Sequence, residues 1–177
     1  MRETIQMQQD YANRNLAFRE TVQIAAIITD MIALQRSKLE QNKCVVSTHF
    51  APIPPLWLQR FKLAHVIANL LVNAIDATLM RGHDEKRIDV AVLEDSGTVV
   101  IRIKDNGIGF DLQQKERLFQ YGYTTKQRGR GLGLHSCANS MTDIGGTINA
   151  FSDGPNQGAV FELRFELEQH LQGDADA

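Results

Sequence analysis

The chain has 177 residues, of which 43% are hydrophobic and 23% are charged, with a formal net charge of -2. This composition predicts one compact soluble domain, long enough to bury a core without disulfides or a structural metal. Near-neutral charge argues against nucleic-acid binding, which needs Lys and Arg clustered on one face. Cys44 and Cys137 lack any CxxC spacing, so we interpret them as small buried residues in a reducing compartment.

No segment predicts a membrane anchor or a secretion signal. The most apolar stretch, Val22 to Leu34, is interrupted by Asp30, so it is too short and too charged to span a bilayer. The first residues, Met-Arg-Glu-Thr, lack the apolar core of a signal peptide. We therefore expect a cytoplasmic chain that makes no membrane contact of its own.

The first half of the chain switches between helical and strand periods. Residues 1–15 are polar and Gln-rich and indicate a helix fragment. Apolar residues at i, i+3, i+4, i+7 spacing predict an amphipathic helix over 22–41. A strand over 45–50 and a proline-containing loop follow, and then a long helix rich in Leu, Ile and Ala is predicted over 59–80.

The second half predicts four strands, two helical segments and a long loop. A turn from Glu94 to Gly97 joins the first two strands as a hairpin. Residues 120–130 hold almost no aliphatic side chain and predict a mobile loop. The strands are expected over 87–93, 98–104, 147–152 and 159–167, and the helical segments over 116–119 and 133–144.

Uneven alternation of helices and strands favours an α+β fold, a two-layer α/β sandwich in which helices cover one face of one mixed sheet. Three helices are expected on that face. A doubly wound nucleotide fold would carry Gly-x-Gly-x-x-Gly directly after its first strand. Here Gly129, Gly131 and Gly133 follow a polar loop at strict alternation, and no phosphate loop ending Gly-Lys-Ser/Thr is present.

The first of three chemical clusters lies on the predicted long helix. Asn69, Asn73 and Asp76 recur at four- and three-residue spacing, which places them on one face. For a single Asn, a hydrogen bond to a neighbouring strand or loop is the commoner explanation. Mg²⁺, however, keeps several waters and needs only one or two protein groups when it binds substrate phosphates. One amide oxygen is therefore enough for a cation site.

The other two clusters are rich in glycine. Asp105 ends a predicted strand before Asn-Gly107-Ile-Gly109, so its carboxylate could accept a hydrogen bond from an exocyclic amino group such as that of adenine. A plain Asp-Asn-Gly turn is the alternative. The run from Gly129 to Gly133 enters a helix whose first N–H groups and dipole could hold phosphate oxygens, and a flexible linker is the alternative there.

In this order the segments resemble the gyrase-like ATPase and histidine-kinase superfamily, whose ATP-binding domain is the Bergerat α/β sandwich. The resemblance covers about residues 16–167. The matching segments are Asn69 to Ala77 (N box), Asp105 to Gly109 (first glycine box), Phe119 to Lys126 (F box and start of the lid), Gly129 to Leu134 (second glycine box) and Asp153 to Ala159 before the last strand.

The resemblance implies that Asn73 ligates Mg²⁺, that Asn69 assists at the phosphates and that Lys126 is a third catalytic candidate. It implies that Asp105 reads the adenine amino group and that Phe119 anchors a lid over 120–130. The implied nucleotide-binding set is Asn69, Asn73, Ala77, Asp105, Gly107, Gly109, Phe119, Thr125, Lys126, Gly131, Leu132 and Gly133. Gly122 departs from the family, where many members carry a second aromatic residue, and Tyr123 could substitute.

One position separates the two branches of the superfamily. The hydrolytic branch carries a glutamate four residues before the Mg²⁺ asparagine, where it activates water. This chain has Asn69 there, and an amide cannot take a proton at neutral pH. The resemblance therefore implies a kinase that donates the γ-phosphoryl group of ATP to a histidine on a helical hairpin and, through it, to a response regulator.

The acceptor histidine is expected outside this chain. Among five histidines only His83 is followed by an acidic residue, and it lies in a predicted loop. His65 and His135 are interpreted first as structural or surface residues.

The resemblance divides the chain into three parts. Residues 1–15 look like the end of the second helix of a dimerisation hairpin, residues 16–168 like the ATP-binding domain, and residues 169–177 like a flexible tail. The whole would be a cytoplasmic part of a larger, membrane-bound or soluble sensor. The alternatives are a nucleotide-binding regulatory module without catalysis and a serine-directed kinase of the same superfamily.

Overall fold

The computed structural model describes residues 18–82, 85–125 and 129–171. The predicted hairpin remnant over 1–15, His83, Lys126 and the end of the predicted tail lie outside these residues. The elements in chain order are β1 (Glu20–Val22), α2 (Ile24–Leu34), α3 (Arg36–Gln41), β2 (Cys44–Phe50), β3 (Leu56–Leu58), α4 (Arg60–Arg81), β4 (Lys86–Asp95), β5 (Thr98–Asp105), α5 (Leu112–Arg117), α6 (Gly133–Asp143), β6 (Gly146–Phe151), β7 (Ala159–Glu166) and α7 (Leu167–His170).

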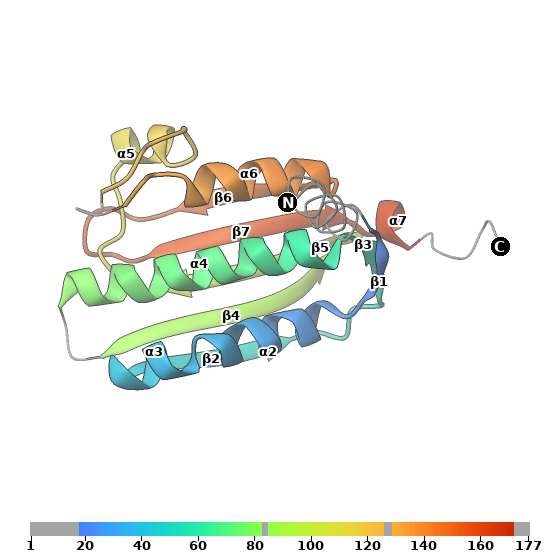
Figure 1. Cartoon of the computed structure of the whole chain (residues 1–177), viewed down its shortest axis with the longest axis horizontal. Helices are drawn as coiled ribbons and strands as arrows, with labels where there is room; N and C mark the ends of the chain where they lie inside the picture. Colours follow the sequence, from blue (N-terminus) through green and yellow to red (C-terminus); the bar gives the residue numbers. More distant parts are fainter. Residues whose placement is uncertain (1–17, 83–84, 126–128, 172–177) are drawn as a thin grey trace, which may run out of the picture.

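The predicted two-layer sandwich is confirmed. A five-stranded sheet has the order β2-β4-β5-β7-β6, with β2 parallel to β4 and every other pair antiparallel. Figure 1 shows α2, α4 and α6 side by side on one face of this sheet, with α4 between the other two. Alternating strand residues such as Ile88, Val90 and Ile101 are buried beneath the helices, so the core lies between the two layers.

The central helix α4 is the longest element. Eight of its residues are buried, and the first seven of them belong to the hydrophobic core: Leu63, Val66, Ile67, Leu70, Leu71, Ala74, Ile75 and Thr78. By length and composition alone α4 could cross a membrane, but a core helix of a soluble protein passes the same test. It ends at Gly82, which adopts φ +71° as a left-handed cap.

Two local predictions were wrong. The predicted helix over 22–41 breaks at Gln35, whose N–H donates to the Ile32 carbonyl 3.0 Å away in a tightened turn. No Gly or Pro marks that break. The predicted turn over 116–119 begins earlier, as α5, because Asp111 and Gln114 form a reciprocal capping box.

The strands β1 and β3 were not predicted. They pair only with each other, Glu20 opposite Leu58 and Val22 opposite Leu56, so their stability depends on a partner far along the chain. Three-residue strands also carry too little alternation to detect. At the C-terminal end, α7 occupies the start of the predicted tail, and His170 is 2% exposed.

Both cysteines are free and buried, as predicted. Burial raises the pKa of the Cys137 thiol to about 12 and also raises that of Cys44. Neither thiol is therefore a nucleophile near neutral pH.

Candidate functional site

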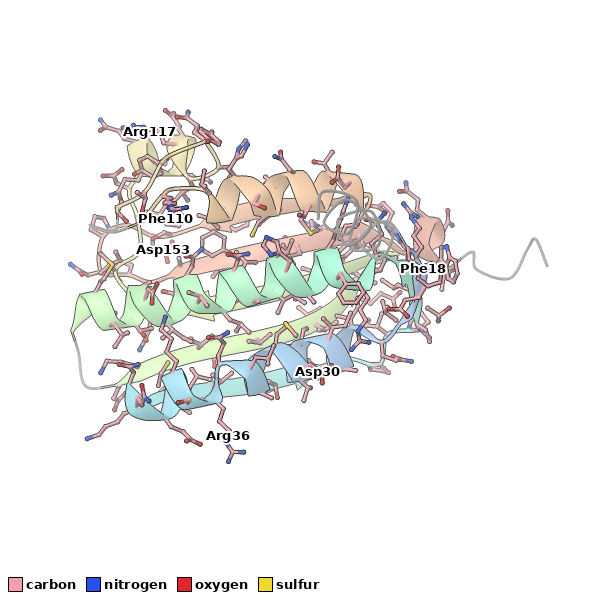
Figure 2. All side chains as sticks on the ribbon, in the orientation of Figure 1. Phe18, Asp30, Arg36, Phe110, Arg117 and Asp153 are labelled. Atoms are coloured by element: carbon pink, nitrogen blue, oxygen red, sulfur yellow. The ribbon has the colours of Figure 1, made fainter. Side chains whose placement is uncertain are left out.

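A pocket of about 420 Å³ opens where four parts of the fold meet: the second half of α4, the end of β5, the α5 segment and the start of α6. Figure 2 places Phe110, Arg117 and Asp153 at this end of the sheet and Phe18 at the opposite end. The described lining residues are Asn69, Val72, Asn73, Ala77, Met80, Asp105, Ile108, Gly109, Phe110, Gln114, Leu118, Tyr123, Thr124, Thr125, Gly129, Arg130, Gly131, Leu132, Gly133, Leu134, Ala159 and Phe161.

Asp105 is the last residue of β5, and the residue is 3% exposed. Burial raises the pKa of Asp105 to about 6, although backbone N–H groups of Gly107 and Ala159 donate to the carboxylate and lower it in part. The Gly107 N–H lies 2.8 Å from Oδ1. A desolvated acceptor at the base of an apolar pocket suits one specific hydrogen-bond donor on a flat ligand.

The first glycine box is held in place by close backbone contacts. The Ile108 N–H donates to the Ala77 carbonyl at 3.2 Å, and the Gly158 N–H donates to the Gly107 carbonyl at 3.1 Å. A Cβ atom on Gly107 would collide with the backbone of Ala77, and one on Gly109 would lie 2.7 Å from the Ser152 hydroxyl. Glycine is therefore required here by contact with α4 and with the loop before β7.

The predicted polar face of α4 divides between two environments. Asn69, Asn73 and Ala77 line the pocket. Asp76 does not; its carboxylate pairs with the Lys38 ammonium of α3 at 2.6 Å. The pocket thus receives two carboxamides from α4, while the carboxylate of the cluster ties α4 to α3.

In the described part of the predicted lid segment, a backbone hydrogen bond joins the two ends. The Gly122 N–H donates to the Gly131 carbonyl at 3.1 Å, and Gly131 adopts φ +67°. The Arg117 guanidinium lies over the Tyr123 ring, 4.8 Å from the ring centroid. That Tyr123 substitutes for the second aromatic residue of the family stays a prediction. Thr125 reaches the pocket as predicted, whereas Lys126 lies outside the described residues.

Two described residues of the predicted nucleotide-binding set, Gly107 and Phe119, are absent from the pocket lining. Phe119 packs against the hydrophobic core, while the neighbouring Leu118 lines the pocket. The Phe119 carbonyl lies 3.1 Å from Nδ1 of His135, and the His135 ring meets Tyr121 edge-on. The segment before the lid is thus attached to α6 through His135.

The start of α6 provides the positive end of a helix. No side chain caps its N-terminus, and Gly131, Leu132 and Gly133 all line the pocket. First-turn N–H groups and the helix dipole favour an anion at this position. Arg130 is the one cationic residue of the described lining, and Asp105 is the one anionic residue.

Sequence reasoning missed much of the apolar lining. Met80 could have been found, since it lies three residues after Ala77 on the same helix face. Ile108, Phe110, Ala159 and Phe161 come from segments that are remote in sequence, and only folding brings them together.

Among known families, the one described as histidine kinase-, DNA gyrase B- and HSP90-like ATPase matches residues 59–169, which is more than half of the chain. The chain belongs to this family. The match includes both glycine boxes and the pocket side of α4. It agrees with the family resemblance seen in the sequence.

Curated relatives of this ATPase-family domain are sensor kinases. The C4-dicarboxylate transport sensor protein DctB of Pseudomonas aeruginosa is 30% identical over 160 residues, covering 88% of this chain and 23% of that protein. AtoS, a signal transduction histidine-protein kinase of Escherichia coli, is 31% identical over 145 residues. That match covers 81% of this chain and 23% of AtoS. The chain spans 12% to 36% of the length of eight curated relatives that it matches.

Solved histidine kinase structures share the fold of this ATPase-family domain. The catalytic domain of histidine kinase ThkA superposes with a TM-score of 0.74 at 22% identity, covering 84% of this chain and 95% of that one. Full-length ShkA in complex with AMPPNP gives a TM-score of 0.73 at 19% identity, and the match covers 84% of this chain and 31% of ShkA.

Proposed function

We propose that this chain binds Mg²⁺-ATP and donates the γ-phosphoryl group to a histidine on a helical hairpin in two-component signalling. The polarity of the pocket carries the proposal. A buried carboxylate, Asp105, marks one region, and the Asn69 and Asn73 amides and the uncapped α6 mark another. A ligand with an amino-bearing ring and a phosphate chain matches both regions.

The purine would lie against the first glycine box. Asp105 accepts a hydrogen bond from the exocyclic amino group, and the apolar side chains of Ala77, Met80 and Ile108 surround the ring. The triphosphate then extends toward α6, where Gly131 to Gly133 and Thr125 contribute to its binding. Lys126 is proposed to add a positive charge there.

The absence of a base at the phosphate end supports phosphoryl transfer over hydrolysis. Asp105 is the only carboxylate of the described lining. It is buried at the end of β5, where its carboxylate accepts a hydrogen bond from the Gly107 N–H. Asn69 cannot accept a proton at neutral pH. Water is therefore poorly activated, and the chemistry is positioning and charge neutralisation.

The residues present are compatible with Mg²⁺. Within the described ranges no group of three or more His, Cys, Asp or Glu residues could hold a metal alone. The pocket offers amide oxygens instead, of which Asn73 is the proposed ligand, and Mg²⁺ commonly takes few protein groups when phosphates complete its shell. When bound, the ion would neutralise charge on the phosphate chain.

The acceptor hairpin and the response regulator are proposed partners because the sequence resembles sensor histidine kinases and because relatives are named as a histidine-protein kinase and a two-component sensor. Transfer would break the bond between the γ-phosphorus and the β,γ-bridging oxygen, form a bond from phosphorus to an imidazole nitrogen, and leave ADP in the pocket. Because ATP and response regulators are cytoplasmic, we propose a cytoplasmic location for this domain, including within a membrane-bound sensor.

Phosphate chemistry tests the proposal. The chain should be incubated with Mg²⁺-ATP labelled at the γ-phosphate and with a purified helical hairpin that carries one acceptor histidine. Label on the hairpin that is lost in acid and stable in base is expected. Acid-stable label would indicate a serine-directed kinase, and tight ATP binding with no label on the hairpin would indicate a regulatory nucleotide-binding module.

Asn73→Ala should remove the Mg²⁺ dependence of ATP binding. Losing one metal ligand should weaken Mg²⁺-ATP binding about tenfold, while metal-free ATP binds as it does to wild type. Titration calorimetry with and without Mg²⁺ measures both affinities. Asn42→Ala, at the residue that follows α3 and outside the pocket lining, is the matched control. An unchanged Mg²⁺ effect in Asn73→Ala would contradict the assigned role.

A further inference from the structure

The carboxamide of Asn69 is held in one orientation by two acceptors. Its Nδ2 lies 3.0 Å from the backbone carbonyl of His65 and 3.0 Å from Nε2 of the His65 ring. A carbonyl oxygen only accepts, so the amide nitrogen faces His65 and Oδ1 points the other way. A Cβ built on Gly133 would lie 3.4 Å from that Oδ1, which therefore faces the start of α6.

The His65 ring also contacts the helix that follows the lid. Its Nε2 lies 3.2 Å from the hydroxyl of Ser136, in the first turn of α6. Asn69 Nδ2 only donates, and it lies 3.0 Å from Nε2 and 3.4 Å from Nδ1, so a ring nitrogen of either neutral tautomer can accept from it. The Ser136 hydroxyl can donate to Nε2 or accept from it. One ring thus connects the amide of α4 to α6.

We propose that His65 is a positioning residue that aims the Asn69 amide oxygen at the phosphate end of the pocket. The inference rests on the proposed function. One amide hydrogen of Asn69 bonds to the His65 carbonyl and the other to the His65 ring, which restrains the Asn69 side chain against rotation. The ring also contacts Ser136, which the backbone carbonyl does not. His65 itself does not line the pocket, so its effect on nucleotide passes through Asn69.

Exposure of His65 makes it suitable for substitution. The residue lies at the surface of α4, so its truncation leaves no cavity in the core. His65→Ala removes the ring but keeps the carbonyl, and His65→Gln restores an acceptor oxygen. His49, an exposed histidine on β2, gives the matched control His49→Ala.

The experiment measures dissociation constants of Mg²⁺-ATP and AMP for wild type, the three histidine variants, Asn69→Ala and the double variant of His65 and Asn69. His65→Ala should weaken Mg²⁺-ATP binding about fivefold, the effect of one hydrogen bond, with AMP binding almost unchanged. His65→Gln and His49→Ala should stay near wild type. In the Asn69→Ala background, His65→Ala should cause no further loss.

Three outcomes would overturn the inference. Unchanged ATP affinity in His65→Ala would mean that the carbonyl alone orients the amide. Equal losses for ATP and AMP would indicate a general structural role, and additive losses in the double variant would mean that His65 acts independently of Asn69. Failure of wild type to bind Mg²⁺-ATP would instead reject the proposed function together with this inference.

Discussion

Asp105→Asn should abolish most ATP affinity while leaving the nucleotide-free domain as stable as wild type or more stable. The carboxylate is the proposed acceptor for the adenine amino group. With asparagine in its place, the side-chain NH2 group faces the adenine amino group, and both groups are hydrogen-bond donors. We expect about a 100-fold loss of affinity, because a buried mismatched polar pair is costly. Calorimetric titration with ATP and thermal unfolding of the free protein measure the two effects.

The stability part of this prediction follows from burial. Since the pKa of Asp105 is raised to about 6, the charged carboxylate opposes folding at neutral pH by about 3 kcal/mol. Asparagine carries no charge, so Asp105→Asn removes the cost of burying a carboxylate. This gain in stability offsets the weaker hydrogen bonds from the backbone N–H groups. A large fall in the unfolding temperature of Asp105→Asn at pH 8 would contradict this account.

Glu162→Gln is the matched control, a second buried carboxylate outside the pocket. Glu162 is 5% exposed and accepts from Arg102 at 2.7 Å and from Arg164 at 3.1 Å. Removing this charge leaves two arginines with weaker partners, so the domain should lose stability and keep its ATP affinity. The two variants should therefore show opposite patterns.

ATP affinity should also depend on pH through Asp105. A group whose pKa is raised on folding favours the folded state below its unfolded value, near 3.8, and this contribution is lost as pH rises through about 6. The charged form is the better acceptor, so affinity should rise as pH increases from about 5 to 7. Asp105→Asn should show no such rise, and the same rise in that variant would assign it to another group.

Gly107→Ala should destabilise the domain strongly and disrupt the pocket. The added methyl would lie 2.7 Å from both the Cβ and the carbonyl oxygen of Ala77, inside α4, which cannot move without disturbing the core. We expect a loss of about 3 kcal/mol, or about 10 °C in Tm, together with weaker ATP binding because the loop after Asp105 shifts. Thermal unfolding and ATP titration measure both.

Gly97→Ala separates collision from backbone conformation. Gly97 adopts φ +82° in the β4–β5 turn, with no atom within 4 Å of a built Cβ. Its substitution should cost about 1 kcal/mol from the left-handed conformation alone, with ATP affinity unchanged. Equal losses for the two variants would contradict the collision with Ala77.

Elements with strong local signals were predicted from the sequence and differ from the structure by about two residues at their ends. The long periodic helix became α4, and the hairpin around Gly97 became β4 and β5. The break at Gln35 and the β1–β3 pair were missed, because the first has no helix-breaking residue and the second forms only when remote segments meet.

The site shows the same division. Sequence by itself determined three features and their order along the chain, which is the order of this family. Two amides lie on one helix, Asp105 ends a strand, and a glycine run leads into a later helix. Only the tertiary structure decided that Asp105 is buried enough to raise its pKa, that Phe119 packs against the core outside the pocket lining, and that the His65 ring contacts the Asn69 amide. Spacing along one helix or strand is a local property, whereas burial and side-chain orientation depend on segments that the rest of the chain brings into contact.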